Sequence, residues 1–145
     1  MKRGVVLLTL LLSLLLSAKL SAQNILGTWY NDTKDAKVEI YKGKDGKYHG
    51  KIVWLKEPNR DGKPKVDKFN SNDKLRTRPV MGLIILSGFQ AQKDGKTYED
   101  GTIYDPKNGK TYSCKITQTE NDKLNIRGFI GISLIGRTTV WTRAN

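Results

Sequence analysis

The chain has 145 residues, with 26 Lys and Arg against 14 Asp and Glu, a formal net charge of +12 and 37% hydrophobic residues. A chain of this length is expected to form one domain. It contains one Cys and one His, which excludes an internal disulfide and the usual Cys and His sets that hold structural zinc.

The first 22 residues are predicted to be a secretory signal peptide. A basic start at Lys2 and Arg3 precedes an almost wholly apolar run, and small residues follow this run up to Ala22. The apolar run is shorter than the roughly 20 residues that span a membrane comfortably, so an N-terminal membrane anchor is the weaker interpretation. We therefore expect a mature domain at residues 23–145, periplasmic or secreted, with no transmembrane segment.

The mature domain stays basic. Loss of Lys2, Arg3 and Lys19, with no acidic residue, leaves a net charge of +9. Such a charge is typical of nucleic-acid-binding proteins, but export would separate the domain from nucleic acid. Two interpretations remain: a solvated surface whose lysines keep strand edges from pairing, and a site for an envelope polyanion. We expect no nucleic-acid partner, and we expect a monomer.

Alternation of apolar and polar residues predicts strands early in the mature chain, at residues 25–30, 36–41 and 48–55. In the third of these, alternation places Tyr48, Ile52 and Trp54 on one face. The tripeptide Gly27-x-Trp29 resembles the opening motif of lipocalin-like barrels, in which the Trp plugs one end.

Residues 56–79 are predicted to be a long basic loop or a short helix. Most connections run about 4–6 residues, so a segment of this length is usually functional or disordered. Ser71 or Asn72 is suited to cap a short helical turn that ends before Pro79. Val66, Phe69 and Leu75 are suited to pin the segment to a barrel mouth. Its oxygen-bearing side chains do not match the spacing of a calcium loop, so we predict no metal.

Five further strands are predicted, at residues 80–89, 97–105, 110–119, 123–129 and 137–143. Asp-Gly and Asn-Gly pairs between strands predict tight turns. The run at 80–89 reads as a buried strand because Pro79 and internal glycines flank and interrupt it. About eight short strands are typical of an all-β barrel or sandwich, and a closed barrel leaves no exposed edge. If the last strand pairs with the first, Arg137 or Arg143 would lie over Trp29.

Three stretches carry a resemblance to a known family: Leu75-Arg76-x-Arg78-Pro79-x-x-Gly82, Asp100-Gly101-x-x-Tyr104-Asp105-Pro106-x-x-Gly109-x-x-Tyr112 and Leu124-x-x-Arg127-Gly128. With these motifs, the chain resembles the small exported bacterial proteins of DUF2147, a domain-of-unknown-function family. The resemblance covers nearly all of the mature chain. It implies a single antiparallel lipocalin-like β-barrel and a periplasmic or secreted location, and it supplies no established activity.

No catalytic constellation is recognisable. The serines lack the Gly-x-Ser-x-Gly context of hydrolases, and His49 has no second His or Cys pair to work with. Glu99 and Asp100 are adjacent, so in a strand they point to opposite faces and cannot act as a paired acid and base. Cys114 alternates with polar neighbours, so we expect it to be a small core residue and not a reactive thiol. We predict no cofactor and no metal, and an enzyme is the least favoured of three functions.

The favoured function is a barrel that binds a small apolar or amphipathic anionic ligand in its interior. Aromatic residues would line this interior, and Arg127 or the Arg76 and Arg78 pair would hold an anionic head. The candidate site residues are Trp29, Trp54, Arg76, Arg78, Tyr104, Tyr112, Arg127 and Trp141. Whether these aromatics fill the barrel or leave it hollow stays open, because eight strands allow both. The alternative is a cell-envelope interaction protein that contacts anionic glycans, lipid head groups or a protein through loop 56–79.

Overall fold

The computed structural model describes residues 24–132 and 134–145. The predicted signal peptide at residues 1–22 lies outside the described residues. Among those that are described, no helix is long and apolar enough to cross a membrane.

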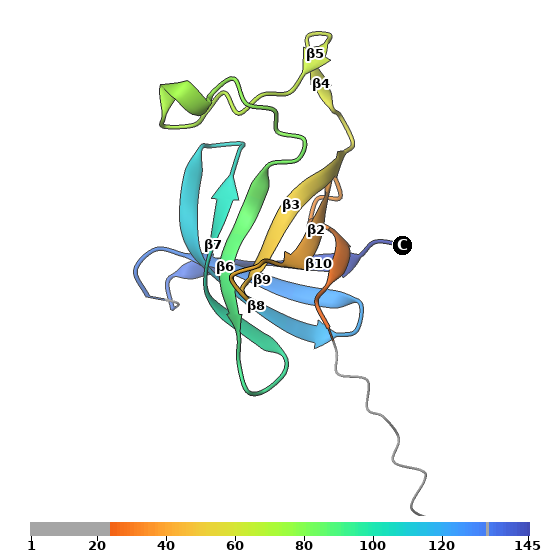
Figure 1. The fold of residues 1–145 in the computed structure, drawn as a ribbon, viewed down its shortest axis with the longest axis vertical. Helices are drawn as coiled ribbons and strands as arrows, with labels where there is room; N and C mark the ends of the chain where they lie inside the picture. Colours follow the sequence, from red (N-terminus) through yellow and green to blue (C-terminus); the bar gives the residue numbers. More distant parts are fainter. Residues whose placement is uncertain (1–23, 133) are drawn as a thin grey trace, which may run out of the picture.

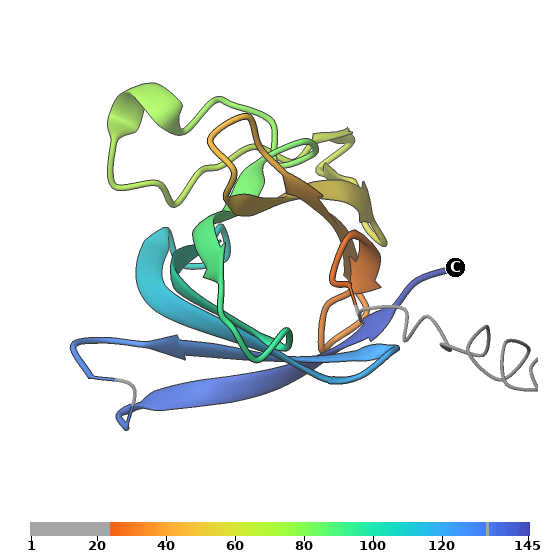
Figure 2. The same cartoon turned by 60° about the horizontal axis from the view of Figure 1, so that its bottom comes forward.

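Eight antiparallel strands close into a barrel (Figures 1 and 2). They are β1 (Gly27–Tyr30), β2 (Ala36–Lys42), β3 (Tyr48–Leu55), β6 (Ile84–Ala91), β7 (Thr97–Asp105), β8 (Lys110–Glu120), β9 (Lys123–Phe129) and β10 (Gly136–Arg143). Each strand pairs with its neighbour along the chain, and β1 closes the ring by pairing with β10, with Trp29 opposite Arg143. The prediction of a single antiparallel all-β barrel is confirmed.

Short polar turns reverse the strands at the predicted Asp-Gly and Asn-Gly corners. The side chain of Asp45 accepts a hydrogen bond from the N–H of Lys47 (2.9 Å), and Asp94 accepts one from Lys96 (2.9 Å). Gly109 adopts a φ of 74° and lies so close to the backbone of Phe69 that a Cβ atom would collide with it. The corner between β7 and β8 therefore supports a distant part of the chain as well as turning its own strands.

The core consists of buried side chains from every barrel strand, together with Ile25, Val80 and Leu83 from outside the strands. The core residues on the strands include Trp29, Val38, Ile40, Ile52, Leu86, Phe89, Tyr98, Ile116, Leu124, Ile126 and Trp141. Cys114 is among them at 2% exposure, and burial raises the pKa of its thiol to about 12. The predicted core position of Cys114 is confirmed, and its thiol stays protonated at neutral pH.

Trp29 plugs one end of the barrel. Its indole Nε1 donates a hydrogen bond to the carbonyl oxygen of Ile25 (2.9 Å). The guanidinium of Arg143 lies 4.2 Å from the ring centroid, which confirms the predicted cation–π contact and assigns it to the second of the two candidate arginines. Arg143 also donates hydrogen bonds to the carbonyl oxygens of Asn24 (2.8 Å) and Leu26 (3.0 Å), so it ties the segment before β1 over the plug.

A bulge in β3 turns Trp54 to the outside of the barrel. Val38 pairs with Ile52, but the preceding residue of β2, Lys37, pairs with Trp54, so Val53 is an extra residue in the ladder. One extra residue reverses the side-chain alternation. Ile52 is buried while Trp54 is 36% exposed, so the prediction that these two side chains share a face is wrong.

The apolar run at residues 80–89 is only partly a strand. β6 begins at Ile84, and the preceding residues form a turn in which the N–H of Leu83 donates to the carbonyl oxygen of Val80 (3.1 Å). Gly82, with a φ of 84°, permits this turn. Val80 and Leu83 are buried although they do not belong to β6, so burial and not strand pairing accounts for their apolar character. The prediction is wrong for these first four residues.

We call the connection between β3 and β6, residues 56–83, the mouth segment (top of Figure 1). It contains the two-stranded ribbon of β4 (Asn59–Arg60) and β5 (Lys63–Pro64) and the single 3-10 turn η1 (Asp73–Leu75). The side chain of Asn72 caps η1 by accepting a hydrogen bond from the N–H of Lys74 (3.1 Å), as the sequence predicts.

Candidate functional site

A cavity of about 810 Å³ extends from the unfilled part of the barrel interior to the loops at its mouth. Its apolar wall comes from inward-facing residues of six strands, namely Val38, Ile52, Ile85, Ile103, Ile126 and Trp141. Trp29 does not line this cavity, because it lies fully buried in the plug at 0% exposure. The barrel is thus filled at one end and hollow at the other, which resolves the alternative that the sequence leaves open.

The cavity opens at the end of the barrel where β1, β3, β7 and β9 finish. Residues from the connections after the first three of these strands line it, including Asp32, Lys56 and Lys107. Val66, Phe69 and Val80 of the mouth segment line it as well. The mouth segment therefore borders the entrance, as predicted for Val66 and Phe69, whereas Leu75, predicted with them, is not one of the lining residues.

The inner face of β10 runs from the mouth to the plug. Arg137, Thr139 and Trp141 all line the cavity, because alternate residues of a strand point to the same side. Arg143, the next residue in this series, lies over Trp29. One strand thus supplies a cation at the mouth, an aromatic wall and the cation that closes the far end.

Gly128 of β9 marks open space in the cavity wall. A Cβ atom at this position would lie 3.6 Å from Ile103 and 3.7 Å from Tyr112, which are ordinary van der Waals distances. By contrast, a Cβ at Gly101 would overlap the buried ring of Phe89. The filled part of the barrel is therefore tightly packed at Gly101, whereas the wall at Gly128 accepts added atoms.

Charged side chains surround the mouth. The basic ones are Lys56, Arg60, Lys65, Lys107 and Arg137, and the acidic ones are Asp32, Asp35, Glu57 and Asp105. Lys107 is already paired, since its Nζ lies 2.7 Å from a carboxylate oxygen of Asp35. Arg137 makes no ion pair with any residue that the structure describes. Its charge is therefore not neutralised by a protein carboxylate.

Asp35 is held in its ionised form. Burial raises the pKa of this carboxyl, but hydrogen bonds from Lys107, Asn31 and Thr33 outweigh that effect and lower the pKa to about 2. Asn31 Nδ2 and Thr33 Oγ1 donate at 2.6 and 2.8 Å. At neutral pH Asp35 is therefore a fixed anion engaged with Lys107.

Asp67 fastens the mouth segment to β7. It is fully buried, and its carboxylate accepts hydrogen bonds from Tyr104 Oη (2.6 Å), Asn70 Nδ2 (2.9 Å) and Arg78 Nε (2.9 Å). Burial raises the pKa of Asp67, but these hydrogen bonds and the charge of Arg78 together hold the pKa below its ordinary value. Burial and the hydrogen bond to Asp67 raise the pKa of Tyr104.

Arg76 has a structural role in the mouth segment. Its Nε donates to the carbonyl oxygen of Asn70 (2.7 Å), and its Nη1 lies 2.6 Å from a carboxylate oxygen of Asp73. The Arg76 and Arg78 guanidiniums are therefore both occupied in holding this segment together, the latter through Asp67.

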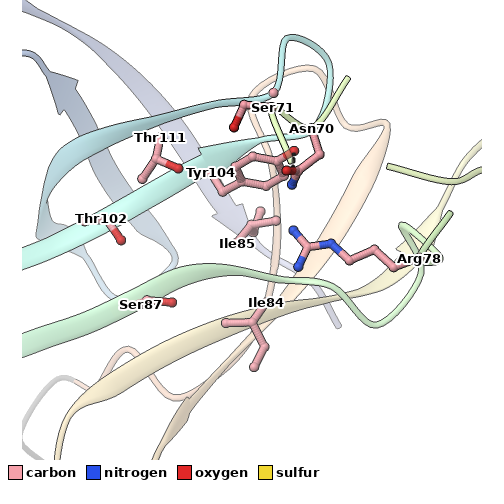
Figure 3. A pocket seen from close by; sticks show the side chains of 10 residues that line it. Asn70, Ser71, Arg78, Ile84, Ile85, Ser87, Thr102, Tyr104 and Thr111 are labelled. Carbon is pink, nitrogen blue, oxygen red and sulfur yellow. Dashed lines mark hydrogen bonds between the residues drawn. The ribbon is translucent and has the colours of Figure 1, made fainter. Parts of the chain in front are cut away.

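A second, smaller hollow of about 270 Å³ lies between the mouth segment and strands β6 to β8 (Figure 3). Arg78 and Tyr104 face each other across it, and the hydroxyls of Ser87, Thr102 and Thr111 come from the strands. Its lining is mostly polar, so it does not extend the apolar interior of the barrel.

The structure separates the eight predicted site residues into three groups. The large cavity is lined by Tyr104, Tyr112 and Trp141. A second group has structural roles: Trp29 forms the plug, and Arg76 and Arg78 hold the mouth segment together. The third group, Trp54 and Arg127, lies outside the cavity. Arg127 donates a hydrogen bond from Nη1 to Thr138 Oγ1 (3.0 Å) instead of facing the cavity. The expected interior positions of Trp54 and Arg127 are therefore wrong.

Sequence reasoning missed Arg137 as a site residue and Asp67 as a fastening residue. Alternation along β10 puts Arg137 on the face of Trp141, so a signal for Arg137 was present in the sequence. Asp67 carried no such signal, because its partner Tyr104 is 37 residues away in the chain.

We expect the Asp67 cluster to make stability depend on pH in the acid range. In the unfolded chain the carboxyl titrates near its ordinary pKa of 3.8, and in the folded chain below it. Its contribution is therefore complete above about pH 4–5 and lost as pH falls through the folded pKa. Replacing Asp67 with Asn should lower the free energy of unfolding by about 1–3 kcal/mol at pH 7.

Urea unfolding of both proteins from pH 7 to pH 2.5 checks this prediction. The difference in free energy of unfolding between them should shrink as pH falls below 4. A difference that stays constant across the range would contradict a role for the ionised Asp67 carboxylate.

Comparison with known proteins agrees with this geometry. The family model described as an uncharacterized protein conserved in bacteria (DUF2147) matches residues 27–143. The chain belongs to the DUF2147 family. The match spans the whole barrel from β1 to β10, so the plug, the mouth segment and the cavity all lie within the family domain.

A solved structure supports the barrel type. The chain is similar to protein HP1028 from the human pathogen Helicobacter pylori, which belongs to the lipocalin family, with 27% identity over 84% of each chain and a TM-score of 0.71. No curated protein matches the chain. The lipocalin-like fold of this DUF2147 protein is therefore shown.

Proposed function

We propose that this barrel binds one small amphipathic molecule, with the apolar part in the cavity and an anionic group at the mouth. The observation that carries this proposal is the apolar cavity of about 810 Å³ left open between the plug and the mouth segment. Pockets for small ligands have volumes of about 300–1,000 Å³, mostly apolar walls and a few placed polar groups.

The cavity wall favours an apolar group. Branched aliphatic side chains and the ring of Trp141 form it, and removal of apolar surface from water stabilises a complex by about 25 cal/mol per Å². Polar groups are concentrated at the mouth instead. A ligand with an apolar body and one polar end therefore matches the lining along its whole length.

The charge at the mouth favours an anionic end. Arg137 shares the inner face of β10 with Trp141 and makes no ion pair with a described residue. Lys56, Arg60 and Lys65 of the mouth segment lie at the same entrance. Of the four carboxylates at the mouth, Asp35 is already engaged with Lys107.

We propose that the protein binds its ligand without catalysing a reaction. His49 is used away from the cavity, where its Nε2 lies 3.0 Å from Asp45 and its Nδ1 accepts a hydrogen bond from the N–H of Gly88 (3.3 Å). The membership of HP1028 in the lipocalin family supports a ligand-binding barrel.

We also propose that the protein acts after export, periplasmic or secreted, because its first 22 residues have the pattern of a signal peptide.

Titration with 11-(dansylamino)undecanoic acid and with its methyl ester tests the proposal. We expect saturable binding of one equivalent of the acid, weaker binding of the ester, and about tenfold weaker binding of the acid after Arg137→Gln, because a charge-assisted contact is lost. Arg127→Gln is the matched control, since this residue lies outside the cavity.

Each outcome bears on a separate part of the proposal. Absence of saturable binding for both acid and ester would overturn the ligand-binding function. Equal binding of acid and ester would retain the cavity and refute the anionic end. An equal loss in the Arg127 and Arg137 variants would refute the role of Arg137.

A further inference from the structure

The turn between β9 and β10 is apolar and exposed. Its side chains Ile130, Ile132, Leu134 and Ile135 are 72%, 59%, 85% and 69% exposed. We call these four residues the apolar tip. By contrast, the short turns at residues 31–35, 43–47, 92–96 and 121–122 are made of polar residues and glycine, as at Lys44-Asp45-Gly46. Large contiguous apolar exposure of this kind marks an interaction surface.

The apolar tip stands away from the barrel core. Figure 2 shows the blue hairpin of β9 and β10 extending beyond the ring formed by the other strands, and Figure 1 agrees. A backbone hydrogen bond from the N–H of Ile135 to the carbonyl oxygen of Ile132 (3.1 Å) closes the turn. None of the four side chains belongs to the buried cluster, so their apolar character does not serve the fold.

Basic residues stand at the base of the hairpin. Arg127 on β9 pairs with Thr138, and Arg137 on β10 pairs with Gly128, one step nearer the turn. Neighbouring positions on a hairpin point to opposite faces, so the two arginines flank it on both sides. No acidic residue follows Asp122 in the sequence. The hairpin therefore combines an apolar end with a purely cationic base.

We propose that the apolar tip inserts into the surface of an anionic lipid bilayer, with the arginines at the level of the head groups. Insertion into the interface depends on buried apolar area together with attraction between basic residues and anionic lipid, and the hairpin offers both. None of the four residues of the apolar tip lines the cavity, so insertion of the tip is separate from the occupation of the cavity.

A second protein copy fits this surface less well. A stable protein interface takes about 20–30 residues and about 800 Å² from each partner, and four side chains at a hairpin turn supply a small part of this. A bilayer surrounds a protruding turn on all sides and needs no complementary shape.

The strand topology gives the docked protein an orientation. The β9–β10 turn lies at the same end of the barrel as the cavity mouth, because alternate connections of an antiparallel barrel share an end. Insertion of the apolar tip would therefore place this end of the barrel against the membrane.

Vesicle flotation tests the proposal with the chain from residue 23 onward, which contains every barrel strand. We expect binding to vesicles of phosphatidylglycerol and phosphatidylethanolamine, and little binding to phosphatidylcholine alone. The double variant Ile132→Asn with Leu134→Asn should bind the anionic vesicles at least about tenfold more weakly. Val53→Asn is the control, because Val53 is an exposed aliphatic residue on β3.

A spectroscopic variant gives a second readout that does not rely on loss of function. In Leu134→Trp, anionic vesicles should shift the emission of the new tryptophan to shorter wavelength, and lipids brominated on their chains should quench it. Unchanged vesicle binding by the double asparagine variant, or an unshifted emission, would overturn the proposal. A dimer in sedimentation experiments that the double variant abolishes, without vesicle binding, would assign the tip to a second copy instead.

Discussion

Replacing Trp29 with alanine is expected to lower the free energy of unfolding by about 3–5 kcal/mol. The side chain is fully buried, so its removal leaves a large cavity at the closed end of the barrel. The variant also loses the indole hydrogen bond to Ile25 and the ring beneath Arg143. Arg143 would then lie over a void, although it ties the segment before β1 to the plug.

Trp54→Ala is the matched control for this prediction. Trp54 lies on the outer surface, where its ring contacts Tyr30 at a centroid distance of 6.1 Å. Its removal should cost about 1–2 kcal/mol, because an aromatic pair contributes about 0.5–1.5 kcal/mol beyond the area that it buries and the ring is only partly covered. Urea unfolding followed by circular dichroism measures both variants. Similar losses for Trp29 and Trp54 would contradict the assignment of Trp29 as the plug.

Replacing Gly128 with phenylalanine is expected to abolish saturable binding of the dansyl acid, with affinity reduced at least about 100-fold. A Cβ at this position meets no atom closer than 3.6 Å, and Gly128 lines the cavity, so the new ring would occupy ligand space. Stability should change by no more than about 1 kcal/mol in either direction, because added apolar contacts offset local adjustment.

Ser113→Phe is the matched control for this prediction. Ser113 lies exposed on β8, directly opposite Phe129 of β9, so the same ring is added without entering the cavity. Its binding of the dansyl acid should equal that of the original protein. If Gly128→Phe does not fold, Gly128→Leu places a smaller side chain at the same point and should weaken binding to an intermediate degree. Full binding by a folded Gly128→Phe would move the site out of the cavity.

Strand positions followed closely from the sequence. β3, β7 and β9 have the predicted bounds, and the Asp-Gly and Asn-Gly corners turn where expected. These features depend on interactions between residues a few positions apart, such as the contact of Asp45 with Lys47. The family resemblance and the plug by Trp29 were also accessible, because both depend on short sequence motifs.

The predicted site was less accurate because it depended on which way side chains face. The bulge at Val53 reversed the direction of Trp54, and nothing in the local sequence separates a bulge from a regular strand. The prediction of Arg127 in the interior failed for a related reason. Arg127 pairs with Thr138, which alternates with the cavity-lining Arg137 and Thr139 of β10, so Arg127 faces outward, and this register appears only in the folded sheet.

The sequence by itself determined the all-β class, the number and order of the barrel strands and the polar turns, since alternation and turn chemistry act over a few residues. Only the tertiary structure decided that the barrel is half filled and half hollow. That outcome depends on side chains that meet from six strands, and on Asp67 reaching Tyr104 to hold the mouth segment in place. Volumes left between distant residues are a property of packing, and packing is specified only when the ring closes.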